Sequence, residues 1–146
     1  MNETNNHSVA GGWLGTYYYR GLQAGMPPVR FEAAFQTAAE GKFAGTILDD
    51  GVGGEARATG VQTGLEVAFT KVYLARRRSY AQPVEYEGAL SGDGKTMRGT
   101  WWIRESRGFA EARGVWEARR LWSVESREEQ EVAAEARDEV REMTVA

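Results

Sequence analysis

Apolar and polar residues alternate with period two along much of this chain, and this pattern limits the fold more than any other feature. The alternation is clearest in five segments, residues 29–36, 65–73, 84–90, 97–104 and 111–119. Apolar side chains at every second position indicate β-strands with one buried face and one face in water. Three less regular segments of similar length occur at 13–20, 42–48 and 55–62. The sequence therefore predicts eight strands.

The connections between these segments are short and contain turn-forming residues. Asp93-Gly94 separates two alternating runs, which is a strong signal for a tight hairpin, and Glu40-Gly41 joins two earlier strands. Glycines also mark the connections at 50–54 and 62–64. No segment long enough for a crossover helix interrupts the strands, so a parallel βαβ sheet is excluded. We expect an all-β, antiparallel, up-and-down sheet.

Glycines inside the predicted strands favour closure of this sheet into a barrel. Six of them fall on the face predicted to point inward: Gly15, Gly45, Gly60, Gly88, Gly99 and Gly114. Glycine weakens a strand unless the sheet bends sharply or another group approaches the backbone closely. Closure also removes the two exposed edges of an open sheet. We therefore predict a closed eight-stranded β-barrel over residues 11–122.

The two ends of the chain differ in composition from this central unit. Residues 1–10 are polar and are predicted to be a disordered leader. Residues 123–146 contain eight acidic residues and three arginines and none of the aromatic residues or glycines. Ser126 and Glu129 are spaced as a capping box, and apolar residues follow at helical spacing. A C-terminal α-helix is expected, lying on the barrel or binding a protein partner or a second copy of the chain.

Composition excludes several classes of protein. The absence of cysteine excludes disulfides and thiolate metal sites, and no apolar run is long enough for a transmembrane helix. Because no secretory signal is visible, we expect a cytoplasmic protein. A net charge of −3 argues against nucleic-acid binding, so the basic run Arg76-Arg77-Arg78 is interpreted as a solvated loop or as a rim that attracts anionic ligands. We predict no cofactor, no metal and no membrane association.

Catalytic motifs are also missing from the central unit. Its 112 residues contain no histidine, the commonest general base, since the only histidine is His7. The sequence has no nucleophile elbow, no zinc-protease motif and no phosphate-binding loop. No catalytic residue is predicted from these patterns.

The first and last strands carry a resemblance to a known superfamily. Gly11-Gly12-Trp13 opens the first strand, and Arg119 and Arg120 end the last one. With eight evenly spaced strands, this pattern resembles the calycins, which include lipocalins, fatty-acid-binding proteins, avidins and nitrobindins. In lipocalins, the tryptophan packs beneath an arginine of the last strand and closes one end of the barrel. The resemblance implies the same contact between Trp13 and Arg119 or Arg120. It does not imply biotin or haem, since the matching polar and histidine residues are missing.

The inward face supplies the candidate binding residues. They are mostly aromatic: Tyr17, Tyr19, Phe69, Lys71, Tyr73, Tyr86, Trp101 and Trp116. An eight-stranded barrel either fills its interior with side chains or holds one small ligand. The favoured interpretation is non-enzymatic binding of a small, mainly hydrophobic or amphipathic ligand in the lumen, with or without an anionic group. The alternatives are a solid barrel that acts as a protein-interaction module and a small barrel enzyme.

Lys71 is the one charged residue on the most regular inward face. A buried ammonium group must find an anion, shift its pKa or reach solvent. One interpretation pairs Lys71 with a ligand carboxylate or phosphate, assisted by tyrosine hydroxyls. The other places Lys71 near the barrel opening with its head group in water. In the enzyme alternative, Lys71 is a base or a Schiff-base nucleophile.

Overall fold

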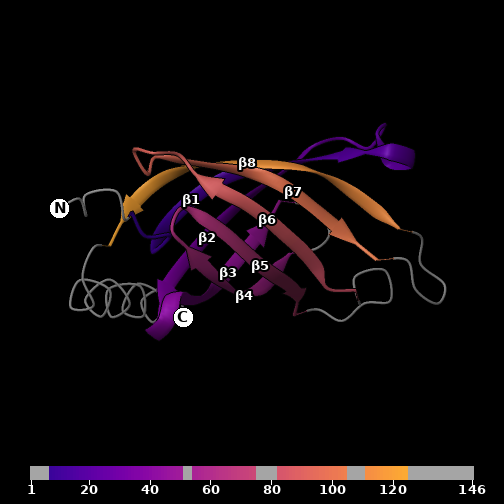
Figure 1. Cartoon of the computed structure of the whole chain (residues 1–146). Coiled ribbons are helices and arrows are strands. Elements are labelled where there is room, and N and C mark those ends of the chain that lie inside the picture. The colour runs from indigo at the N-terminus through magenta and orange to yellow at the C-terminus, as the bar shows by residue number, and fades with distance from the viewer. Residues whose placement is uncertain (1–6, 51–53, 75–81, 105–110, 125–146) are drawn as a thin grey trace, which may run out of the picture.

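The computed structural model describes residues 7–50, 54–74, 82–104 and 111–124. Eight antiparallel strands form a closed barrel in which each strand pairs with the next and β8 pairs with β1 (Figure 1). The strands are β1 (Gly11–Arg20), β2 (Val29–Thr37), β3 (Lys42–Asp49), β4 (Glu55–Thr63), β5 (Glu66–Tyr73), β6 (Val84–Leu90), β7 (Thr96–Ile103) and β8 (Ala112–Ser123). Two short 3-10 helices, η2 (Gly21–Gln23) and η3 (Ala39–Gly41), lie in the connections.

The predicted all-β class, antiparallel order and barrel closure are confirmed. The main difference is β8, which continues to Ser123 instead of ending at residue 119. Its last residues pair with the start of β1, where Gly11 and Gly12 lie opposite Ser123 and Trp122 beyond a register shift between Gly12 and Trp13. The predicted C-terminal helix, apart from its first two residues, and Arg76-Arg77-Arg78 lie outside the described residues. Within the described part of the chain, no helix has the length and apolar character needed to cross a membrane.

The barrel interior consists of the side chains that the alternation assigns to the inward face. All of the inward side chains predicted as core are buried except Tyr19, Leu65 and Ile103, which are half-buried and pack against the same core. The first residue of β8 and the first residue of β2, Ala112 and Val29, are also half-buried and pack there. Burial of this aromatic face is the main driving force for closure.

Two strand glycines make room for indole rings that lie flat against the barrel wall. A Cβ atom on Gly114 would lie 2.5 Å from Nε1 of Trp101, and one on Gly88 would lie 2.7 Å from Cζ2 of Trp116. The Trp101 indole donates to the backbone oxygen of Tyr18 at 3.1 Å. Glycine is therefore needed at these positions for close approach of an aromatic ring, in addition to the curvature that the sequence suggested.

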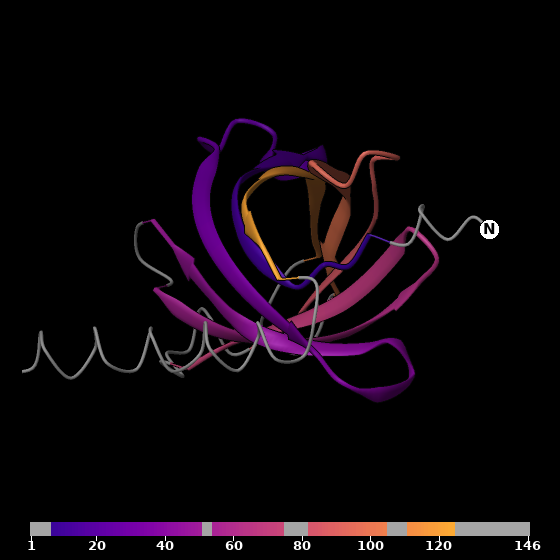
Figure 2. The same cartoon turned by 90° about the vertical axis from the view of Figure 1, so that its left-hand side faces the viewer.

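One end of the barrel is closed by an arginine stacked on a tryptophan. The guanidinium carbon of Arg120 lies 4.4 Å from the centre of the Trp13 ring. Its three nitrogens donate to the backbone oxygens of Ser8, Ala10 and Gly94 at 2.6, 2.9 and 2.8 Å. Of the two arginines that the resemblance offered, Arg120 therefore makes the contact. Figure 2 shows the barrel from this end.

The segment before β1 takes part in this closed end. Trp13 Nε1 donates to the backbone oxygen of Val9 at 3.0 Å, and the Val9 side chain is fully buried in the core. Residues 7–10 belong to the stretch predicted as a disordered leader, whereas in the structure they cover one end of the barrel. Residues 1–6 lie outside the described part.

The opposite end is the one where the chain passes from β1 to β2, from β3 to β4, from β5 to β6 and from β7 to β8. We call this end the mouth. The connection between β1 and β2 extends away from the barrel there (Figure 1), and its Leu22 is 95% exposed.

Candidate functional site

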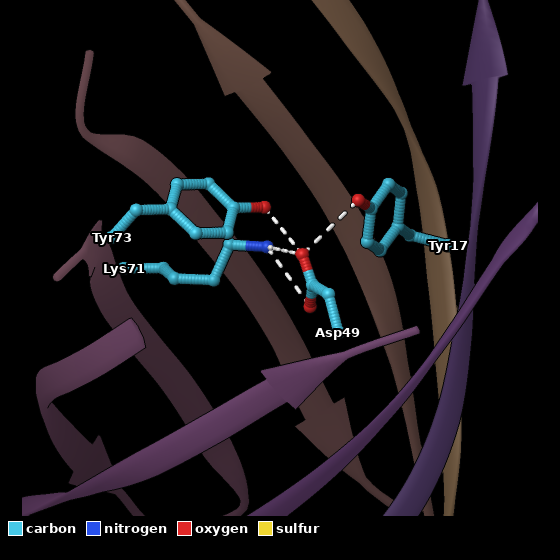
Figure 3. A network of polar contacts seen from close by, with 4 residues as sticks. All are labelled: Tyr17, Asp49, Lys71 and Tyr73. Atoms are coloured by element: carbon cyan, nitrogen blue, oxygen red, sulfur yellow. Dashed lines mark hydrogen bonds and ion pairs between the residues drawn. The ribbon is translucent and has the colours of Figure 1, made fainter. Parts of the chain in front are cut away.

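Four polar side chains meet inside the barrel near its mouth, and we call them the polar quartet: Tyr17, Asp49, Lys71 and Tyr73 (Figure 3). Asp49 is the last residue of β3, Lys71 and Tyr73 face inward from β5, and Tyr17 comes from β1. Lys71 Nζ donates to Oδ2 of Asp49 at 3.1 Å, and Oδ1 lies at 3.5 Å. The hydroxyls of Tyr17, at 3.2 Å, and of Tyr73 also donate to Oδ2. The carboxylate is thus the centre of the quartet.

Aromatic rings surround the ammonium group of Lys71. Nζ lies 4.8 Å from the centre of the Tyr17 ring, 4.7 Å from Tyr73 and 5.3 Å from Tyr86. These distances are within the range of cation–π attraction. The side chains of Lys71 and Asp49 are each only 1% exposed. The charge of Lys71 is therefore compensated by one carboxylate and by the faces of three rings.

Burial shifts the proton affinities of this cluster. Loss of hydration lowers the pKa of Lys71, an effect that the Asp49 carboxylate opposes. Burial, followed by the negative charge of Asp49, raises the pKa of Tyr17 above its ordinary value. Burial likewise raises the pKa of Tyr73 and of Tyr86. All three phenols consequently stay protonated at neutral pH, and those of Tyr17 and Tyr73 donate to Asp49.

A buried ion pair of this kind adds little to the free energy of unfolding compared with apolar side chains in the same place. Removing two charges from water costs several kcal/mol, and apolar residues of the same volume often serve the fold equally well or better. Every buried polar side-chain atom in the described residues has a hydrogen-bond partner. A fully satisfied polar cluster with shifted pKa values, placed near the open end of an aromatic barrel, is a candidate functional site.

The structure divides the eight predicted site residues between two depths. Tyr19 and Trp101 lie beside the quartet on its mouth side. The centres of their rings are 5.2 Å apart, and the centre of the Trp101 ring lies 5.7 Å from that of Tyr17. Phe69 and Trp116 lie deeper. The Phe69 ring stacks on Tyr86 at 4.7 Å and meets Trp116 edge-on at 5.7 Å. Tyr86 therefore separates the polar quartet from an apolar layer.

The deeper half of the lumen is filled by this apolar layer. Phe35, Phe43 and Phe69 form a triangle with ring centres 5.2, 5.6 and 6.0 Å apart. Ring pairs at these distances are in contact. The mouth side is less tightly closed, because four inward-packed residues there are only half-buried: Tyr19, Val29, Ile103 and Ala112. We call these four residues the mouth ring.

The structure corrects the interpretation that places the Lys71 head group in water, because the residue is 1% exposed. The anion that lies beside Lys71 in the structure is Asp49 of the same chain. Asp49 is the residue that sequence reasoning missed. The inward positions Phe43, Gly45 and Ile47 of β3 continue by alternation to Asp49, so the pattern contained the signal. The prediction ended that strand at residue 48 and began the connection at residue 50, so Asp49 was not assigned to the inward face.

A groove of about 900 Å³ lies outside the barrel and follows the outer faces of β2, β3 and β4. Short side chains such as Ala34, Ala44 and Thr59 form its floor, and Lys42 and Arg57 add positive charge. The groove shares no residue with the polar quartet. It is the main alternative location for a ligand or a partner.

No protein-family model matches the chain, and no curated protein is significantly similar to it. The resemblance to calycins therefore stays a prediction, supported by the strand order and by the contact between Trp13 and Arg120. In the described residues, no group of three acidic or histidine side chains is placed to hold a metal ion.

Proposed function

We propose that the barrel binds a small, mainly hydrophobic molecule non-covalently on the mouth side of the polar quartet. The observation that carries this proposal is the quartet itself, a set of buried hydrogen-bonding groups at the bottom of the half-buried mouth ring. Ligand sites combine apolar walls with a few fixed polar groups in this way. The walls contribute about 25 cal/mol per Å² of apolar surface removed from water. The quartet fixes the ligand's orientation.

The packing of the lumen supports this location. The deeper layer is occupied by Phe35, Phe43 and Phe69, whereas the four residues of the mouth ring are only half-buried. A ligand that enters from the mouth would replace water there and meet Trp101 and Tyr86 before the apolar layer. Flat, unsaturated molecules suit these ring surfaces.

The charge of the quartet favours a neutral ligand over an anionic one. Asp49 already compensates the charge of Lys71 at 3.1 Å, so the pair together is neutral. An anion beside Lys71 would also lie close to the Asp49 carboxylate, and like charges at short range repel each other strongly in a buried site. We therefore propose a ligand with one neutral polar group, such as a hydroxyl, a carbonyl or an aromatic amine.

A second candidate function is a protein-interaction module, and the groove on β2, β3 and β4 favours it. That groove is large, external and lined by short side chains. A partner bound there would leave the lumen unchanged. The predicted C-terminal helix, most of which lies outside the described residues, is a further candidate contact in this alternative.

Fluorescence titration with 1-aminoanthracene, a flat neutral probe with one amine, separates the two candidates. Ala112 belongs to the mouth ring and Val115 is on the outer face of the same strand. We expect saturable binding to the wild type, a loss of about tenfold or more in affinity in Ala112→Trp, and little change in the matched control Val115→Trp. Absence of saturable binding, or equal affinities in both variants, would refute lumen binding.

A further inference from the structure

We propose that Lys71 forms a reversible imine with a carbonyl group of the bound ligand, with Asp49 as proton acceptor and as counter-ion of the product. The ligand class is an apolar aldehyde or ketone. This inference rests on the proposed function, since the carbonyl carbon must reach the layer of Lys71. It goes further by giving the site a covalent chemistry.

The placement of the amino group is the first argument. In the described residues, the ion-pair partner of Lys71 is Asp49 alone, and Nζ otherwise faces the rings of Tyr17, Tyr73 and Tyr86. A methionine would fill the same apolar space without the desolvation of a charge. An amine kept in such a place is suited to react as a nucleophile, because its low-hydration surroundings favour the neutral form.

The second argument is that a proton acceptor and proton donors are already in position. Asp49 Oδ2 lies 3.1 Å from Nζ and can take a proton from the ammonium group. Tyr17 and Tyr73 donate to the same oxygen and, because burial raises the pKa of both, stay protonated as donors while the carbonyl oxygen gains charge. The cluster thus contains a nucleophile and two hydrogen-bond donors, all within hydrogen-bonding distance of one base, Asp49.

The reaction balances without any further reagent. Asp49 takes one proton from the Lys71 ammonium, and the free amine forms a bond to the carbonyl carbon. The carbonyl electron pair moves to oxygen, which takes a second proton from the nitrogen to give a carbinolamine. Asp49 then returns its proton to the hydroxyl, the C–O bond breaks and water leaves. The products are a protonated imine beside the Asp49 carboxylate and one water molecule, with no oxidation or reduction.

The chain offers its own controls for a test. It has only three lysines, and the other two, Lys42 and Lys95, are exposed. We would incubate the full chain with a low concentration of 2-naphthaldehyde, reduce imines with sodium cyanoborohydride and map the modified lysines by mass spectrometry. We expect Lys71 to be modified about tenfold or more faster than Lys42 and Lys95, because binding raises the local concentration of the carbonyl. In guanidinium chloride the preference should disappear.

Two variants define the site of reaction. Lys71→Arg keeps a cation opposite Asp49 but cannot form an imine, so its adduct at this position should be lost. Val72→Thr changes the outward-facing neighbour of Lys71 on β5, which is 40% exposed, and should leave the modification unchanged. If Lys71 in the folded wild type is modified no faster than Lys42 and Lys95, the proposal is overturned. This result does not depend on whether Lys71→Arg folds.

A non-covalent arm separates this inference from the function on which it rests. Titration with 2-naphthalenemethanol, the alcohol with the same ring system, reports binding without imine formation. Binding of the alcohol together with no preference for Lys71 would refute imine formation and leave the binding function intact. No binding of the alcohol and no preference for Lys71 would refute both. Binding together with selective modification supports both.

Discussion

The ion pair between Asp49 and Lys71 gives the sharpest prediction for stability. Lys71→Met leaves the Asp49 carboxylate 1% exposed with two phenol donors and no cation. Breaking a buried pair from one side costs about 3–5 kcal/mol. The double variant Asp49→Asn/Lys71→Met removes both charges and keeps an amide oxygen that can accept from both phenols. We expect its free energy of unfolding to lie within about 1 kcal/mol of the wild type.

Urea unfolding followed by tryptophan fluorescence measures both variants. Since small domains are stable by only about 5–15 kcal/mol, Lys71→Met is expected to be strongly destabilised or unfolded at neutral pH, while the double variant folds. Val72→Thr serves as the control for the outer face of the same strand. A loss below about 1 kcal/mol in Lys71→Met would refute the reasoning, because it would mean that the lysine head group lies in water.

Three further predictions follow from other parts of the barrel. Burial raises the pKa of Tyr17, Tyr73 and Tyr86, so the folded protein keeps their protons to higher pH than the unfolded chain does. The stability that these protonated phenols contribute is complete below about pH 10 and is lost as the pH rises further. Absorbance at 295 nm should show that the three phenols ionise only together with alkaline unfolding. Arg120→Lys should lower the free energy of unfolding in urea titrations by about 2 kcal/mol, because an ammonium group cannot donate to three carbonyls and also stack on Trp13. An unchanged midpoint would show that these contacts of Arg120 do not stabilise the closed end of the barrel. Glu40 has a φ of 63°, a backbone conformation that favours glycine. Glu40→Gly should therefore raise the free energy of unfolding by about 0.5–1 kcal/mol and raise the thermal midpoint. A lower midpoint would show that contacts of the glutamate side chain outweigh the backbone strain.

The barrel could be predicted because the signals that specify it are local and repeated. Alternation along the strands identifies the inward face at nearly every position, and Asp93-Gly94 fixes a hairpin by its own backbone preference. Tight connections then allow only antiparallel neighbours. The closed end could be predicted in part, since the resemblance gave two candidates for the arginine above Trp13. The structure decides in favour of Arg120, which pairs with Trp13 and lies on the inward side of β8 by the same alternation.

The candidate site was harder to predict, because it depends on which strand ends meet across the lumen. Asp49 and Lys71 are 22 residues apart and lie on strands that do not pair with each other. Their contact depends on the tilt of the strands around the closed barrel, which no local pattern contains. For residues considered one at a time, it is reasonable to end the strand before Asp49 and to place the Lys71 head group in water. The ion pair follows only when both are placed inside.

The central claim is that a ligand binds inside the mouth beside the polar quartet. A ¹H–¹⁵N NMR titration of the full chain with 1-aminoanthracene tests it directly, because ring currents shift nearby amide signals. The account predicts saturable shifts at the amides of Tyr19, Asp49 and Lys71, with the amides of Ala44 and Thr59 in the outer groove unchanged. Shifts confined to Ala44 and Thr59, or no shifts at saturating probe, would contradict it.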